Sequence, residues 1–385
     1  MKEMKQYTIA EICSRLSSGK GIHASKVTPT GPYPVIGGNG VRGYTDSFNF
    51  DGECAIIGRQ GANCGNVRYF QGKAYMTEHA IVAIGNENAN TKYLACLFSL
   101  MHLGNLSAQS AQPGLSVQTL SKQIIYLPEI STQNQIAEII KSLDTKIEIN
   151  KQINDNLEQQ AQALYKSWFV DFEPFKDGEF IESEIGEIPA GWSIVKFGDI
   201  VEIPKKTINP QKFPDTIFNH YSLPACDNGL IAEVQAGKDI MSNKIILQSN
   251  TTLFSKLNPR IKRIWFTCEV LPNSICSTEF IPYRAKIDTE YSYIFSIVNS
   301  DAFYSSVMGC VNGATGSHQR FHAEDTEDFL CAYNKDAVNE FSKLIEPVLK
   351  QMHDLRQENV KLALTRDTLL PKLMSGELKI NDLDC

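Results

Sequence analysis

The stretch TQNQIAEIIKSLDTKIEINKQINDNLEQQAQALYKSWF, residues 132–169, decides the fold of this chain. Its apolar residues recur at alternating steps of four and three, the spacing that lines up side chains along one side of a helix that faces a partner helix. The seam consists of Ile136, Ile140, Leu143, Ile147, Asn150, Asn154, Leu157, Ala161, Leu164 and Trp168. The pattern predicts one long helix with a coiled-coil seam.

A second stretch, residues 336–374, has the same spacing. Its seam consists of Val338, Phe341, Ile345, Val348, Met352, Leu355, Asn359, Leu362, Arg366, Leu369 and Leu373. At an offset of 205 residues Asn154 matches Asn359, so the polar position is shared as well. A buried Asn at a seam position fixes the register and the partner of a helix. Pro347 should kink or split this second helix and Pro371 should end it, because proline removes a backbone donor.

The globular parts before each helix also repeat. At an offset of 201, Arg59 matches Arg260, Thr77-Glu78 matches Thr278-Glu279, and Ser116 and Gln118 match Ser317 and Gln319. The opening Tyr7-Thr8-Ile9 resembles Trp192-Ser193-Ile194 at an offset of 185. A shared offset indicates an internal duplication, in which the second globular copy is longer by an insertion.

Each globular copy alternates short apolar runs, such as residues 55–57, 80–84 and 245–247, with glycine-rich turns. Helices are predicted at Lys92–His102 and Tyr291–Val298, which gives an α/β (α+β) fold class. We predict a first globular domain at residues 1–130 and the first spacer helix with its linker at 131–183. A second globular domain follows at 184–335, and the second spacer helix with a C-terminal tail at 336–385. Pro and Gly residues between 174 and 191 are typical of a linker with fixed turns.

Composition limits the possible classes of protein. The ten cysteines form no Cys-x-x-Cys pair, which favours free thiols in a reducing cytoplasm. No apolar run is long enough to span a membrane and no signal peptide opens the chain, so we expect a cytoplasmic protein without a membrane partner. The net charge of −7 argues against a uniformly basic nucleic-acid binder. Residues 1–130 nevertheless carry 11 Lys+Arg against 8 Asp+Glu, whereas residues 131–184 carry 5 against 11.

Local basic clusters offer a route to DNA. The segment LFSKLNPRIKRIW, residues 253–265, places four cations around a turn between two predicted strands. In the first copy, IIGRQGANCG, residues 56–65, places one Arg and one Gln in a glycine-rich turn after a predicted strand. Arg and Gln read guanine and adenine edges with paired hydrogen bonds, and glycine allows the close approach that such turns need. A solvated hairpin without a ligand is the alternative for either turn alone. The candidate DNA-binding residues are Asn39, Arg42, Arg59, Gln60, Lys256, Arg260, Lys262, Arg263, His318, Gln319 and Arg320.

Catalytic patterns are missing from the sequence. We find no phosphate loop, no dinucleotide fingerprint, no amino-methyltransferase signature and no nuclease motif at a plausible spacing. His318 and His322 are four residues apart but lack a third ligand at metal-binding spacing. We therefore expect a recognition protein with no catalytic residue, no metal and no cofactor of its own.

Three strings carry a resemblance to a known family. LYKSWFVDFEPF at 164–175, EIGEIPAGW at 184–192 and LTRDTLLPKLMSGEL at 364–378 resemble the specificity subunits of type I restriction-modification systems. The resemblance implies two target-recognition domains, each of which reads one half of a bipartite site in double-stranded DNA. It also implies that the two long helices pair as an antiparallel coiled coil with pseudo-twofold symmetry. They would act as a spacer and bind two methyltransferase subunits, which restriction subunits join. S-adenosylmethionine, ATP and Mg²⁺ would belong to those partners.

The helices are expected to supply the contacts to each other and to the partner subunits. The residues assigned to this interface are Ile140, Leu143, Ile147, Asn154, Leu157, Leu164, Trp168, Phe169, Met352, Leu355, Asn359, Leu362 and Leu369. Two other functions stay open from the sequence alone. One is a sequence-specific DNA-binding protein that acts without partners, and the other is a coiled-coil adaptor that does not touch DNA.

Overall fold

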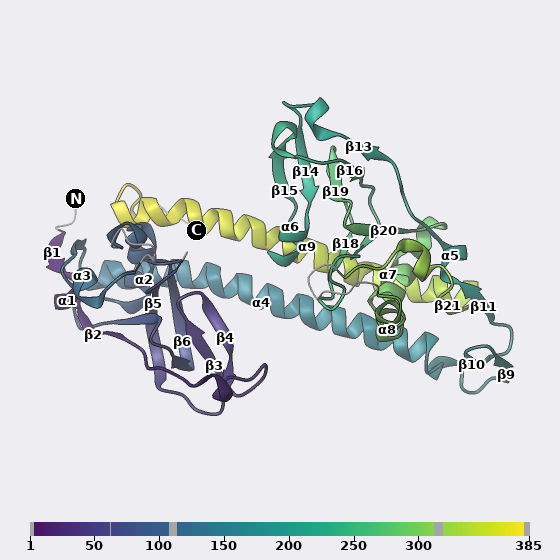
Figure 1. The fold of residues 1–385 in the computed structure, drawn as a ribbon, viewed down its shortest axis with the longest axis horizontal. Helices are drawn as coiled ribbons and strands as arrows, with labels where there is room; N and C mark the ends of the chain where they lie inside the picture. Colours follow the sequence, from purple (N-terminus) through teal and green to yellow (C-terminus); the bar gives the residue numbers. More distant parts are fainter. Residues whose placement is uncertain (1–3, 62, 108–113, 312–318, 381–385) are drawn as a thin grey trace. The chain divides into compact units, whose positions relative to one another are not determined.

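A computed structural model describes residues 4–61, 63–107, 114–311 and 319–380. The chain divides into two compact units (Figure 1). Unit 1 contains residues 1–146 and 362–385, and unit 2 contains residues 147–361. Each unit therefore holds one globular part and one part of each long helix, and the two are described separately below.

Unit 1 is built on a six-stranded sheet. Its elements are β1 (Lys5–Thr8), α1 (Ile9–Ile12), β2 (Cys13–Ser18), β3 (Tyr33–Gly37), β4 (Gly40–Thr45), β5 (Phe50–Gly58), β6 (Val67–Met76), β7 (Ala80–Gly85), α2 (Thr91–Leu100), α3 (Val117–Ser121) and β8 (Ile124–Leu127). The sheet has the order β2-β7-β5-β6-β3-β4, while β1 and β8 form a separate antiparallel pair. Within the sheet only β3 and β6 pair in parallel. Helix α2 confirms the helix predicted at Lys92–His102, with its first turn capped by the Asn90 side chain.

Unit 2 carries two larger sheets and two antiparallel strand pairs, β9-β10 and β11-β21. Its elements are β9 (Phe180–Ser183), β10 (Gly186–Pro189), β11 (Ser193–Lys196), α5 (Phe197–Ile200), β12 (Val201–Glu202), β13 (Thr207–Ile208), β14 (Ile217–Tyr221), α6 (Leu223–Asp227), β15 (Glu233–Ala236), β16 (Lys244–Ile246), β17 (Thr251–Ser255), β18 (Ile264–Thr267), β19 (Ser274–Ser277), β20 (Phe280–Ala285), α7 (Tyr291–Asn299), α8 (Asp301–Gly309) and β21 (Leu330–Tyr333). One sheet has the order β12-β20-β17-β18 and the other β13-β16-β19-β14-β15. The order β12-β20-β17-β18 repeats β2-β7-β5-β6 of unit 1. Four of the five strands of the other sheet come from residues 207–246.

Matching backbone hydrogen bonds occur in both units. Asn86 donates to the carbonyl of Ile12 at 3.0 Å, as Lys286 does to Ile200 at 3.0 Å. Arg59 donates to His79 at 3.0 Å, as Lys256 does to Glu279 at 2.9 Å. These bonds match Arg59 with Lys256, so the predicted match of Arg59 with Arg260 is wrong.

The opening strands need the same correction. Ile9 donates to Gln123 at 3.0 Å and Phe197 donates to Phe329 at 2.7 Å. Tyr7 therefore corresponds to Val195 and not to Trp192. A single sequence offset fails because the loops that join equivalent strands differ in length, whereas the hydrogen-bonded frame tolerates such differences.

Two long helices complete the units. Helix α4 spans Ile130–Phe169, 40 residues, and α9 spans Lys335–Ser375, 41 residues. Every seam position predicted from the heptad pattern is buried or half-buried. In unit 2, Phe169 and Phe341 lie with ring centroids 5.1 Å apart, and Asn150 donates to the Asn359 side chain at 2.9 Å. The helices therefore run antiparallel within that unit.

The structure contradicts a split of α9 at Pro347 and an end of the helix at Pro371. The helix is not split at Pro347, and it continues past Pro371 to Ser375, where Gly376 in a left-handed conformation ends it. Both prolines are exposed, whereas their neighbours Ile345 and Leu373 are buried. Burial of such side chains, about 1.5–3 kcal/mol each, offsets the roughly 3 kcal/mol cost of a proline inside a helix.

Candidate nucleic-acid interface

In unit 1 the predicted residues Arg59 and Gln60 follow directly after β5. The Arg59 amide donates to the His79 carbonyl, and its own carbonyl accepts from Leu115 at 2.8 Å, so the backbone is held on both sides. The Arg59 side chain is half-buried and donates to the carbonyl of Glu78 at 3.5 Å. Gln60 is exposed, and its Oε1 lies 3.1 Å from Nδ1 of His79. A fixed backbone thus presents a polar side chain at the end of the strand.

The hairpin between β3 and β4 lies against the same strand end. A Cβ at Gly38 would approach the His79 carbonyl oxygen to 2.9 Å and the Arg59 nitrogen to 3.5 Å, so only glycine allows this approach. The hairpin carries the predicted residues Asn39 and Arg42, both exposed. The structure therefore brings the four predicted residues of the first copy together.

Sequence reasoning missed Arg68 and His79 of this cluster. Arg68 is the second residue of β6 and is exposed. Its guanidinium packs against Gly40, where a Cβ would come within 2.4 Å of Nη1 of Arg68. Among the described residues, neither Arg42 nor Arg68 forms an ion pair with a carboxylate, so both leave a net positive surface. No local motif marks Arg68; its strand partner Ile56 adjoins the Arg59 turn, and only the strand pairing reveals this.

In unit 2 the loop after β17 and the segment at Gln319–Arg320 come together. Leu257 forms an isolated β-bridge with Arg320, and the Asn258 amide donates to the Gln319 carbonyl at 2.9 Å. Lys256 and Arg260 lie in the same loop. Neither of them has a carboxylate partner in the described part of the chain. His318 lies outside the described residues.

Arg320 and Arg263 are held by carboxylates. Arg320 donates from Nε and Nη2 to the two oxygens of Glu279 at 3.1 and 3.2 Å. Arg263 donates in the same way to Asp227 at 2.6 and 2.9 Å, and this hydrogen bond raises the pKa of Arg263. The two pairs differ in exposure, since the Arg320 side chain is 45% exposed and that of Arg263 only 14%.

Lys262 has a structural contact as well. Its ammonium donates to the carbonyl of Asn299 at the end of α7, at 2.6 Å, and lies 5.6 Å from the ring centroid of Tyr304. Burial lowers the pKa of this lysine. The position of its charge is therefore set by the protein and not by a ligand.

The helix residues assigned to an interface lie in two kinds of environment. In unit 2 Phe169 is packed among Trp192, Tyr293 and Phe341, while Asn150, rather than Asn154, makes the polar contact with Asn359. Four half-buried members pack against the hydrophobic cores: Leu157, Leu164 and Trp168 in unit 2 and Leu369 in unit 1. Leu143, Ile147, Leu355 and Leu362 are half-buried, and Ile140, Asn154 and Met352 are buried.

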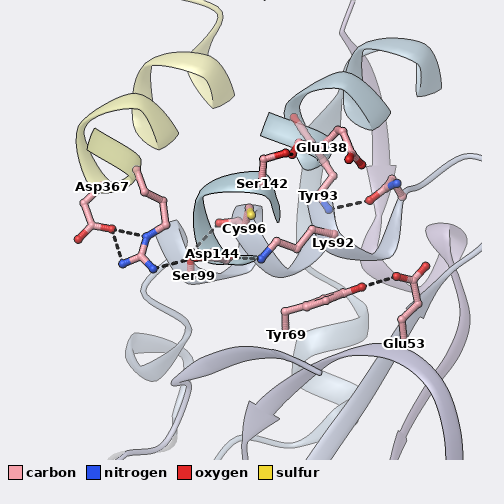
Figure 2. Close-up of polar contacts among 12 residues, drawn as sticks. Glu53, Tyr69, Lys92, Tyr93, Cys96, Ser99, Glu138, Ser142, Asp144 and Asp367 are labelled. Carbon is pink, nitrogen blue, oxygen red and sulfur yellow. Dashed lines mark hydrogen bonds and ion pairs between the residues drawn. The ribbon is translucent and has the colours of Figure 1, made fainter. Parts of the chain in front are cut away.

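A charged network in unit 1, not anticipated from the sequence, joins the globular part to both helices (Figure 2). Lys92 of α2 is 8% exposed and donates to Asp144 of α4, which also accepts from Nη1 of Arg366 in α9 at 2.9 Å. The Lys92 ammonium lies 4.7 Å from the Tyr69 ring centroid. Burial acts to raise the pKa of Asp144, but the hydrogen bonds from Lys92 and Arg366 outweigh it and the net shift is downward. The network fixes α4 and α9 to the first sheet.

Three further features concern the described residues. No group of three or more His, Cys, Asp or Glu side chains in the described ranges could hold a metal ion. No helix in those ranges is long and apolar enough to cross a membrane. The nine cysteines that the structure describes are free thiols, and burial raises the pKa of Cys13 and of Cys54 to about 12.

Several known proteins are similar to this chain in sequence. Residues 1–159 match the family model described as type I restriction modification DNA specificity domain. The chain is 24% identical over 318 residues to the type I restriction enzyme MjaIX specificity subunit of Methanocaldococcus jannaschii, a match covering 78% of this chain and 72% of that protein. It is 38% identical over 147 residues to the EcoprrI specificity subunit of Escherichia coli, covering 37% and 36%.

One solved structure has the same fold. It is the crystal structure of the type I restriction-modification system S subunit from M. genitalium, with a TM-score of 0.60 and 15% sequence identity. The likeness covers 97% of this chain and 96% of that one. The mixed α/β architecture predicted from the sequence is confirmed by this likeness.

Proposed function

Because this chain is a relative of the specificity subunits of type I restriction-modification systems, we propose that it is the non-catalytic subunit that recognises the DNA target of such a complex. The observation that carries the proposal is the family match over residues 1–159, which covers the first globular part and its whole basic cluster. Adenine methylation and ATP-dependent cleavage belong to the partner subunits, which would bind S-adenosylmethionine, ATP and Mg²⁺. The chain acts in the cytoplasm, where its DNA lies.

Each globular part reads one half of a bipartite site. The proposed recognition domains are residues 1–130 and 184–335, and the proposed spacer segments are residues 131–183 and 336–385. In support, the two parts share the strand order and the hydrogen bonds that hold the turn after β5 or β17. In each part this turn adjoins cations that have no carboxylate partner among the described residues, namely Arg42 and Arg68 in the first and Lys256 and Arg260 in the second.

The two helices pair as an antiparallel coiled coil with pseudo-twofold symmetry, set the distance between the half-sites, and bind two methyltransferase subunits. Restriction subunits join that core. The heptad seam and the hydrogen bond between Asn150 and Asn359 support the pairing. Large apolar side chains exposed on the helices, Ile149, Leu344 and Leu364, support a protein partner on their outer faces.

The net charge of the chain also favours partners. A protein with a charge of −7 is repelled by DNA at long range, so much of the attraction to phosphates must come from elsewhere in the complex. This is why recognition within an assembly is preferred to a DNA-binding protein that acts without partners.

The test is an exchange of domains in a host that also expresses the cognate methyltransferase. Residues 1–130 would be replaced by the corresponding segment of a relative, and methylated adenines would be mapped across the genome. We expect one half of the methylated motif to change and the other to stay. A change in both halves would contradict modular reading, and the absence of any sequence-specific methylation with the unaltered chain would contradict the recognition role itself.

A further inference from the structure

The ion pair between Arg320 and Glu279 in unit 2 has a geometry that leaves one edge of the guanidinium free. Glu279 accepts from Nε and Nη2, so it occupies the side of the group next to the chain. Arginine has five N–H donors in a fixed planar arrangement, and both hydrogens of Nη1 and one of Nη2 remain. Those on the outer edge point away in parallel, the arrangement that matches the O6 and N7 acceptors of guanine.

Both partners are fixed from the backbone. The Glu279 carbonyl accepts from Lys256 at 2.9 Å and its amide donates to Oγ of Ser277 at 3.2 Å. Arg320 is held through its β-bridge to Leu257. A guanidinium held in this way loses less conformational freedom when it binds a base than a free side chain would.

Exposure separates this pair from the other one with the same geometry. The Arg320 side chain is 45% exposed, whereas the Arg263 side chain, bound in the same way by Asp227, is 14% exposed. The Arg320 side chain is therefore accessible in the described part of the chain, whereas that of Arg263 is largely covered. Arg320 also adjoins Lys256, whose ammonium has no carboxylate partner in the described residues.

The corresponding place in unit 1 holds a similar contact. His79 matches Glu279 in the backbone hydrogen bonds, and its Nδ1 lies 3.1 Å from Oε1 of the exposed Gln60. In both units, then, the residue directly before β7 or β20 contacts an exposed side chain of a type that reads bases.

We propose that Arg320 reads a guanine in the half-site bound by unit 2, and that Glu279 is a positioning residue that orients the guanidinium for this contact. The inference rests on the proposed function, since it assumes that unit 2 binds DNA. It adds the identity of one base, the residue that reads it and the residue that positions the reader.

The test uses the complete complex with its methyltransferase and DNA duplexes that carry the mapped motif or one altered base pair. We expect Arg320→Ala to reduce discrimination at a single G·C pair by about 5- to 150-fold, the range that one paired contact supplies, and to leave other positions unchanged. Arg320→Lys should lose the same discrimination while it keeps the salt dependence of binding, because lysine retains the charge but not the planar pair of donors. Glu279→Gln should relax the same position by a smaller factor.

Asp227→Asn is the matched control. It removes the carboxylate from the more buried pair, so we expect a lower melting temperature and unchanged base discrimination. An equal loss of affinity for all duplexes in Arg320→Ala, with a shallower salt dependence, would assign Arg320 to a phosphate and overturn the inference. A unit 2 half-site without a G·C pair, or unchanged discrimination in a folded variant, would overturn it too, while the proposed function would stand. Failure of the unaltered complex to bind its motif would instead contradict the proposed function.

Discussion

At the scale of single residues, the basic clusters show which binding residues can be predicted from the sequence and which cannot. Arg42, Arg59 and Gln60 were identifiable because they lie in or beside glycine-rich sequence, where an exposed polar side chain is expected. Arg68 stands in a strand, and its position beside Gly40 depends on the pairing of β5 with β6. The carboxylate partners of Arg263 and Arg320 could not be predicted from the sequence either, because Asp227 is 36 residues from Arg263 and Glu279 is 41 residues from Arg320. Their approach is set by the tertiary fold.

The charged network of unit 1 gives a prediction about stability. Asp144→Asn should lower the free energy of unfolding by about 1–3 kcal/mol, because the poorly exposed Lys92 loses its charged acceptor. Asp367→Asn is the control, since this carboxylate also binds Arg366 but is 63% exposed, and about 0–1 kcal/mol is expected. Urea unfolding of both variants measures the difference.

The same carboxylate sets a dependence on pH. The pKa of Asp144 is lower in the folded protein than its ordinary value of 3.8, so its contribution to stability is present at neutral pH. As the pH falls below about 4 and through the folded pKa, the carboxylate becomes protonated and the contribution disappears. Unfolding curves of the unaltered protein and of Asp144→Asn should therefore converge at low pH. Curves that stay equally far apart would show that the charge of Asp144 is not the cause.

At the scale of elements, the long helices were predicted to within two residues at each end. Their signal is a periodicity sustained over 38 residues, which a turn or a strand cannot imitate. The effect of Pro347 and Pro371 was not predictable in the same way, because the local cost of proline competes with burial of Leu349 and Leu373 in cores that the sequence does not display. The matching of Asn154 with Asn359 was a sequence correspondence, whereas the hydrogen bond joins Asn150 to Asn359.

The antiparallel contacts sharpen a prediction about the spacer. Seven residues inserted after Lys151 together with seven after Gln357 add whole heptads to both helices and keep the seam in phase. Each helix would lengthen by about 10 Å at 1.5 Å per residue, close to three base pairs of duplex DNA. We expect the unspecified gap of the methylated motif to grow while both half-sites stay the same.

Insertion of two residues at the same places is the control. It rotates the seam away from its partner, so assembly with the methyltransferase should fail in co-purification. If the seven-residue variant assembles and the gap stays as it was, the helices do not set the spacing.

At the scale of the whole molecule, unit 1 is completed by residues from the far end of the chain. Leu373 and Met374 of α9 are buried in the same core as Ile136 and Ile140 of α4. A chain that ends after Lys361 should therefore leave residues 4–146 sensitive to protease while unit 2 resists it. A chain that ends after Ile380 keeps the core residues and is the control. Equal protection of unit 1 in both chains would contradict this dependence.

This arrangement also determines when the protein can fold as it is made. The ribosome delivers the first sheet early, but roughly 230 residues, some 10–45 s of synthesis at 5–20 residues per second, separate Lys146 from the helical segment that covers its core. During that time apolar side chains of unit 1 stay uncovered and available to chaperones, and a message cut short before Leu373 yields a first domain that cannot close. The half of the molecule that is translated first is thus the half that finishes folding last.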